Sequence, residues 1–242
     1  MDRELLREAI LRALDVVIDP ELDEPITDLG FVHTVDVSPD GDLEVHLRLP
    51  TSFCAPNFAY LMVSDAKDVL VALDWTRRVT VELDDHHDSE IINAGLAADA
   101  GYRGTFGVEA EDDLEELRVT FQRKAHTAAM ERCLTEWLRA DPERPVADAG
   151  TVVIRDLPDV DTTASLLRRR DSIGLTCAPD DLVMVDHDGN GYAPDVVPLM
   201  LRRARSTRIS IDGNAHFCRG LLKTRYPDTT QELTLAGRNT HS

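Results

Sequence analysis

Two stretches of alternating apolar and polar residues constrain the fold more than any other feature of the sequence. Residues 31–37 and residues 43–49 both alternate with period two, which is typical of strands that bury one face. Between them lies Ser38-Pro39-Asp40-Gly41, a turn sequence in which proline presets φ and glycine accepts positive φ. The pattern predicts a β-hairpin with one apolar face.

Helical periodicity flanks this hairpin on both sides. Residues 3–18 carry apolar side chains at helical spacing and end at Asp19-Pro20, because a residue before proline avoids the α region. A second apolar-periodic segment runs from Phe58 to Leu70, and residues 78–83 alternate again as a third strand. The order α-β-β-α-β predicts a two-layer N-terminal domain.

The rest of the chain reads as mostly helical. Gly101 to Gly107 is glycine-rich and is the best boundary candidate, so we predict one domain over residues 1–105 and a helical region with a few short strands over 106–242. Within that region we expect a long helix over 110–139, a helix over 194–205 and a short strand at Ile209–Ile211. The expected fold class is α+β.

Composition excludes some classes of partner. The sequence has 26 Lys and Arg against 45 Asp and Glu, a formal net charge of −19, which argues against a nucleic-acid backbone or an anionic membrane as partner. No run of about 18 apolar residues is present to span a bilayer, and the N-terminus lacks an apolar signal segment. The four cysteines form no C-x-x-C pair, so we expect free thiols in a reducing cytoplasm.

Cys54 is the first candidate functional residue. It lies between the second predicted strand and the second predicted helix, in Leu49-Pro50-Thr51-Ser52-Phe53-Cys54-Ala55-Pro56. Pro56 suits the first turn of a helix, and the unpaired N–H groups there favour the thiolate form that binds metals and attacks electrophiles. A small buried core residue is the alternative, because free cysteine is among the most buried residue types.

Other candidate metal ligands are spread along the chain. His86 and His87 follow the third strand among carboxylates, and His216 lies two residues before Cys218. A polar turn explains the first pair equally well, and on a helix the second pair would diverge. The carboxylates of residues 21–28 indicate either a cation site or a solvated acidic loop.

Several motifs in the first hundred residues occur together. They are Ala13-Leu14-Asp15 leading to Ile18-Asp19-Pro20-Glu21, then Asp28-Leu29-Gly30-Phe31-Val32, then Leu49-Pro50-Thr51 with Cys54 before a helix. In this combination the chain resembles the iron–sulfur cluster assembly domain family, the PaaD-like or SufT-like group. The family's cysteine is usually followed directly by proline, whereas here Ala55 intervenes and changes the entry into the helix.

The resemblance implies a role in metal-centre maturation. It implies that Cys54, Thr51, Asp19 and Glu21 handle an iron ion or iron–sulfur cluster in transit, with zinc as an alternative, and that the chain docks a client apoprotein and other assembly factors. The whole chain is similar to a longer subgroup that accompanies actinobacterial di-iron monooxygenases, which would make a di-iron enzyme the client. Further metal ligands would come from His86, His87, His216 and Cys218, and a homodimer is left open.

Two other functions stay open at this point. The chain would act as a metal-free adaptor or chaperone module if its acidic surface alone captured a metalloenzyme. It would be an enzyme if Cys54 were a nucleophile with a histidine as base, although the sequence shows no oxyanion loop and no nucleotide-binding loop.

Overall fold

The chain divides into two compact units. The computed structural model describes residues 3–107 and 114–227. The first unit comprises the described parts of Met1–Leu114 and of Asn214–Ser242, and the second comprises Glu115–Gly213. The sequence-based division placed everything after residue 105 in one region, and it differs from this division in that residues 214–227 pack with the first unit.

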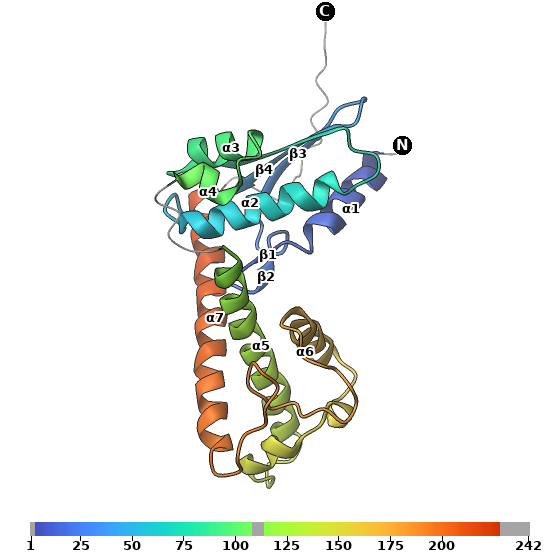
Figure 1. Ribbon diagram of the computed structural model, residues 1–242, viewed down its shortest axis with the longest axis vertical. Coiled ribbons are helices and arrows are strands. Elements are labelled where there is room, and N and C mark those ends of the chain that lie inside the picture. Colours follow the sequence, from blue (N-terminus) through green and yellow to red (C-terminus); the bar gives the residue numbers. More distant parts are fainter. Residues whose placement is uncertain (1–2, 108–113, 228–242) are drawn as a thin grey trace, which may run out of the picture. The chain divides into compact units, whose positions relative to one another are not determined.

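A three-stranded sheet forms the centre of the first unit (Figure 1). Its strands are β3 (Val32–Val37), β4 (Asp42–Arg48) and β5 (Arg78–Asp84), in the order β3-β4-β5. β4 runs antiparallel to β3, as the hairpin pattern predicts, and parallel to β5. In this register Val45 lies opposite both Val35 and Val81, and all three are buried.

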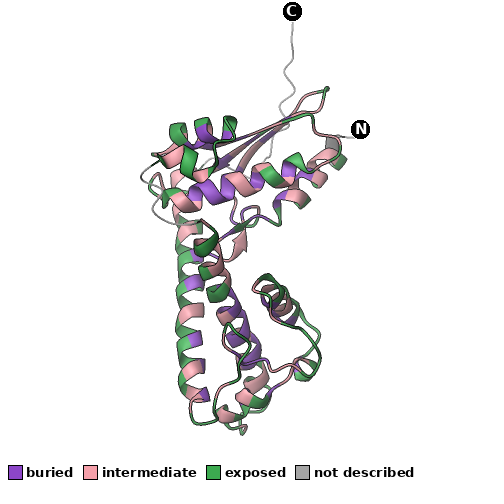
Figure 2. Ribbon diagram, in the orientation of Figure 1, coloured by how far each residue is buried: buried purple, intermediate pink, exposed green. Residues whose placement is uncertain are grey.

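Helices cover this sheet in the predicted α-β-β-α-β order. α1 (Arg3–Leu14) packs on α2 (Pro56–Val71), which crosses between the parallel strands β4 and β5. Figure 2 shows buried residues along α2, and they include Tyr60, Met62 and Leu70. A small antiparallel ribbon, β1 (Ile18–Asp19) with β2 (Glu24–Pro25), joins α1 to the sheet. The α+β class and the two-layer arrangement expected from the sequence are confirmed.

The glycine-rich stretch predicted as a connection is instead helical. α3 (Ser89–Ala97) is followed by α4 (Gly101–Phe106), and the two helices pack on each other. A Cβ added at Gly95 of α3 would lie 2.0 Å from Thr105 Oγ1 of α4, so glycine permits this close approach. Gly95 thus permits the packing of α3 on α4, while Gly101 and Gly107 adopt positive φ at the two ends of α4.

The second unit is built on helices. They are α5 (Leu114–Arg139), two 3₁₀ turns η2 (Val146–Thr151) and η3 (Ile154–Asp156), α6 (Asp161–Ser172) and the first part of α7 (Val197–Arg225). The expected long helix is present over 114–139, while residues 110–113 lie outside the described part. The turn at Asp186–Gly191 is closed by an antiparallel bridge between Val185 and Gly191. The core of the second unit includes the buried side chains of Leu134, Leu166, Met184 and Val197.

The strand predicted at Ile209–Ile211 is wrong, because these residues lie inside the continuous helix α7. The inward positions of α7 recur at alternating spacings of three and four residues. They are Leu201, Ala204, Arg208, Ile211, Ala215, Cys218, Leu222 and Arg225.

None of the helices in the described part of the chain is long and apolar enough to cross a bilayer.

His126 is an unusual core residue of the second unit. Its side chain on α5 is fully buried, and neither ring nitrogen has a hydrogen-bond partner. Burial, reinforced by the charge of Arg170 and by His187, lowers the pKa of His126 to about 4. The imidazole is therefore neutral in the folded chain at pH 7.

We predict that His126 makes the second unit sensitive to acid. Its pKa is lower in the folded chain than in the unfolded chain, so the stability that neutral His126 contributes is present above about pH 6.5 and is lost as the pH falls toward 4. His126→Leu should remove up to about 3 kcal/mol of that pH dependence. Chemical denaturation of both proteins between pH 4 and 8 measures the difference, and identical pH profiles would contradict this assignment.

A second prediction concerns the contact between α3 and α4. Gly95→Ala should destabilise the first unit by about 1–3 kcal/mol, because the new methyl group overlaps Thr105. Gly220→Ala is the matched control: Gly220 lies in a helix of the same unit with no atom near its Cβ position, and alanine there should stabilise by up to about 1 kcal/mol. Denaturant unfolding should give opposite signs for the two variants.

Candidate functional site

Cys54 lies in the turn that leads from β4 into α2. Pro56 occupies the first helical turn and Ala55 is the N-cap residue, so Cys54 immediately precedes the cap. The Thr51 hydroxyl accepts the N–H of Phe53 at 3.1 Å and lies 3.7 Å from the Cys54 sulfur. The Thr51 side chain therefore helps to hold the turn, in which Cys54 is half-buried and lines a pocket while Phe53 is exposed.

His86 supports the Cys54 turn from behind. Its side chain is buried, and its Nδ1 accepts the backbone N–H of Asp88 at 3.1 Å. Nε2 therefore carries the proton and donates to the carbonyl oxygen of Cys54 at 2.9 Å. Because both ring nitrogens are engaged in this way, His86 positions the cysteine turn rather than presenting a free nitrogen to a metal.

Asp19 organises the loop between β1 and β2. One carboxylate oxygen accepts the backbone N–H groups of Glu21 and Leu22, both at 2.9 Å. Only 7% of the residue is exposed, and this burial raises the pKa of Asp19 to about 6 in spite of the two hydrogen bonds. The loop thus brings a carboxyl group of perturbed acidity next to the Cys54 turn.

A small pocket of about 80 Å³ joins the β1–β2 loop, the Cys54 turn and α7. Its polar lining consists of Asp19, Glu21, Cys54 and Cys218, while apolar side chains form its base: Leu22, Phe31, Phe58 and Met62. The volume corresponds to roughly two or three water molecules. The pocket therefore has room for an ion or for one edge of a larger cargo.

Cys218 enters the pocket from α7. Burial, followed by the nearby thiol of Cys54 and then by Asp19 and Glu21, raises the pKa of Cys218 to about 11. The helix is held beside the β1–β2 ribbon by polar contacts on either side of Cys218. Asn214 donates to Glu21 at 3.2 Å, and Arg219 pairs with Glu24.

The end of α7 is anchored on the Cys54 turn. Arg225 donates to the Leu49 carbonyl at 3.1 Å, to the Ser52 hydroxyl at 2.8 Å and to the Asp85 carbonyl. Tyr226 donates its hydroxyl proton to the Asp85 carboxylate at 3.0 Å. Sequence analysis missed Arg225, although the spacing of three and four residues through α7 places it in line with Cys218 and Leu222.

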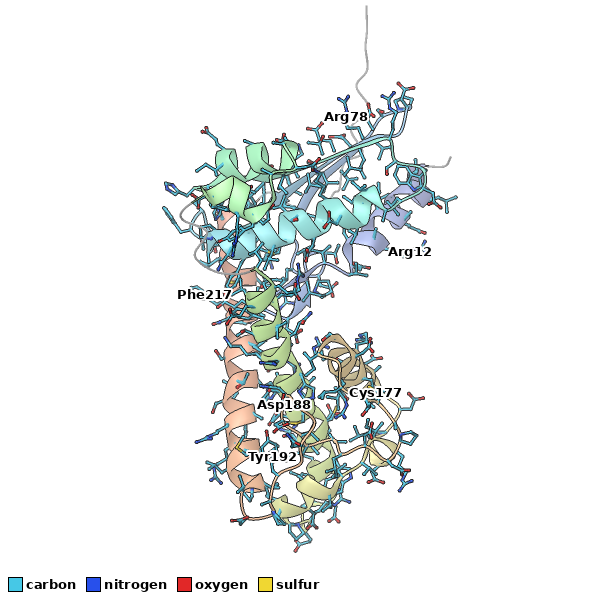
Figure 3. The ribbon with its side chains drawn as sticks, viewed as in Figure 1. Arg12, Arg78, Cys177, Asp188, Tyr192 and Phe217 are labelled. Atoms are coloured by element: carbon cyan, nitrogen blue, oxygen red, sulfur yellow. The ribbon has the colours of Figure 1, made fainter. Side chains whose placement is uncertain are left out.

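The remaining predicted ligands lie apart from the pocket. His87 is exposed and its ring packs on Phe53, with the ring centroids 5.9 Å apart. His216 is exposed on α7, where it diverges from Cys218, and the adjacent Phe217 projects from the helix (Figure 3). Within the described residues, no group of three or more His, Cys, Asp or Glu side chains is arranged to hold one metal ion.

Comparison with known proteins gives one family match. The profile of the family described as "Iron-sulfur cluster assembly protein" matches residues 7–83, which contain the β1–β2 loop, the Cys54 turn and the whole sheet except its last residue. Cys218 and Arg225 lie outside the match. No solved structure matches the chain.

Three relatives illustrate the extent of the similarity. The chain is 34% identical over 80 residues to "Fe-S protein maturation auxiliary factor YitW" of Bacillus subtilis. The aligned residues cover 33% of this chain and 76% of that protein. It is 49% identical over 49 residues to "Iron-sulfur cluster carrier protein" of Mycobacterium tuberculosis, and 29% identical over 90 residues to an uncharacterized protein of Methanocaldococcus jannaschii. The mycobacterial match spans 20% of this chain but only 13% of the carrier protein.

We predict that Asp19→Asn is more stable than the wild type at pH 7. The pKa of Asp19 is raised in the folded chain, so the stability linked to its protonated form is complete below about pH 3.8 and is lost as the pH rises through about 6. Asparagine keeps an acceptor for both N–H groups without the buried charge. The gain should reach up to about 3 kcal/mol above pH 6 and vanish near pH 4.

Asp19→Ala is the control for this prediction. It removes the acceptor and leaves the N–H groups of Glu21 and Leu22 unpaired, so it should lower stability by about 1–3 kcal/mol across the whole pH range. Thermal and urea unfolding of the three proteins between pH 4 and 8 separates the two effects. An Asn variant less stable than the wild type at pH 7 would show that the ionised carboxylate is favoured.

Proposed function

The chain belongs to the iron–sulfur cluster assembly protein family, and we propose that it acts as an assembly or carrier factor whose Cys54 thiolate handles an iron–sulfur cluster in transit. The observation that carries the proposal is the placement of Cys54 in a small pocket at the entry to α2, within the residues that the family profile matches. The cluster is the cargo of this site rather than a resident cofactor.

The chemistry of the pocket supports a thiophilic cargo. A thiolate is a soft ligand that suits iron–sulfur clusters, with Zn²⁺ as an alternative cargo. Asp19 and Glu21 line the same pocket, where carboxylates would favour a cation, and Thr51 lies against the sulfur. His86 donates to the Cys54 carbonyl and so holds the backbone of the cysteine turn in place.

The surroundings of the pocket support the docking of a recipient protein. Phe53 beside the cysteine is 81% exposed, and its ring packs on the exposed His87. An exposed aromatic side chain next to a transfer site is suited to contact a client apoprotein. The net charge of −19 favours a client, or another assembly factor, with a basic docking surface. A di-iron enzyme is a second class of client, and assembly as a homodimer belongs to the same proposal.

Metal analysis of Cys54→Ser tests this function. Wild-type protein, reconstituted anaerobically with iron and sulfide, should carry iron with sulfur-to-iron charge-transfer absorption and should pass it to an apo-ferredoxin. Cys54→Ser should retain less than about a tenth of the iron, because a direct ligand contributes at least as much as an outer-shell residue. Cys177→Ser is the matched control, since Cys177 is an exposed thiol of the second unit.

Two outcomes would contradict the proposal. Unchanged iron in Cys54→Ser would remove Cys54 from the site. Wild-type protein that remains colourless, yet still captures an apoprotein in the presence of a chelator, would favour the metal-free adaptor function instead.

A further inference from the structure

We infer that Cys54 and Cys218 form a two-thiolate half-site, in which the C-terminal helix supplies the second sulfur and the recipient supplies the remaining ligands of the bound metal. The inference rests on the proposed function, and it adds to it the residue that lies outside the family match and the chemistry of the recipient. It predicts a recipient that presents free thiolates, because thiolates exchange with thiolates without a change of ligand type.

The position of Cys218 is fixed by contacts on several turns of α7. Ala215 and Leu222, one turn away on either side, pack into the core of the first unit. Asn214 and Arg219 hold the β1–β2 ribbon, and Arg225 holds the Cys54 turn at three points. A thiol placed between such anchors has a defined direction, and that direction is into the pocket that Cys54 lines.

Cys54 and Cys218 line the same pocket of about 80 Å³, which brings the two thiols near each other. Both cysteines also pack against the core of the first unit. Two neighbouring thiolates repel each other in an apolar pocket, and a cation between them removes that repulsion. No disulfide joins them, since both are free cysteines.

The described residues do not complete a coordination shell. Among residues 3–107 and 114–227, no third His, Cys, Asp or Glu is arranged with these two sulfurs to hold one ion. Tetrahedral iron and zinc sites need four ligands, so a recipient would have to supply two of them. A site that is half-built in this way can hold cargo briefly and release it to a partner that contributes the other two ligands.

The binding step balances without a redox partner. Two S–H bonds break, two sulfur–metal bonds form, and two protons pass to solvent. Release reverses this one sulfur at a time: a recipient thiolate bonds to the metal as one carrier thiolate leaves, and the oxidation state of the metal is unchanged.

Titration with Cd²⁺ alone tests the half-site, because each cadmium–thiolate bond adds ultraviolet charge-transfer absorption. The full chain is titrated under reducing conditions as wild type, Cys54→Ser, Cys218→Ser and Cys177→Ser. Wild type and Cys177→Ser should give equal absorption per bound Cd²⁺. Cys54→Ser and Cys218→Ser should each give about half of that absorption per bound Cd²⁺, and each should bind Cd²⁺ at least about tenfold more weakly than wild type.

The outcomes separate this inference from the proposed function. Loss of signal in Cys54→Ser with wild-type behaviour in Cys218→Ser would overturn the half-site and leave Cys54 as a single transfer thiol. Wild-type behaviour in both variants would overturn both proposals.

A second measurement does not depend on how the variants fold. Dibromobimane becomes fluorescent when it links two neighbouring thiols, and peptide mapping of the wild-type chain identifies the linked pair. The expected product joins Cys54 to Cys218 and is suppressed by prior addition of Cd²⁺. A product that joins neither residue would overturn the inference.

Discussion

The parallel pairing of β4 with β5 is the constraint on which the site depends. Carboxyl ends of parallel strands lie at the same edge of a sheet, so the turn after β4 and the turn after β5 must meet. Cys54 follows the first strand and His86 the second, and they join through the hydrogen bond from the imidazole to the Cys54 carbonyl. The backbone N–H of His87 adds a bond to the Ser52 carbonyl at 2.9 Å. A cysteine at this edge is therefore held by two strands at once.

The end of α7 makes a second use of the same edge. Arg225 bonds to carbonyl oxygens of Leu49 and Asp85, the residues that follow β4 and β5. Asp85 adopts a φ of 54°, a left-handed conformation that aspartate tolerates better than most residues. Its carbonyl is thereby turned to a partner that lies some 140 residues further along the chain. The anchoring of the end of α7 thus depends on the sheet's topology.

The pocket combines groups whose acidities are perturbed in the same direction. Burial raises the pKa of both Asp19 and Cys218, so the neutral form of each gains relative to water. At pH 7 Cys218 is therefore protonated, whereas Asp19, with a pKa of about 6, is mostly ionised. Under the proposed function, binding of a metal by Cys218 would release its proton and would therefore depend on pH.

The sequence by itself determined the hairpin, its flanking helices, the position of Cys54 before a helix and the family resemblance. These features are local: period-two alternation, proline at the start of α2 and short motifs are all decided by neighbouring residues. Only the tertiary structure decided that Cys218 lies in the Cys54 pocket, that His216 does not, and that His86 supports the turn from within the core. The placement of Cys218 depends on α7 continuing as one helix through residues 209–211. The end of this helix contacts the Cys54 turn, which lies about 170 residues earlier in the sequence. No local sequence pattern specifies such a long-range contact.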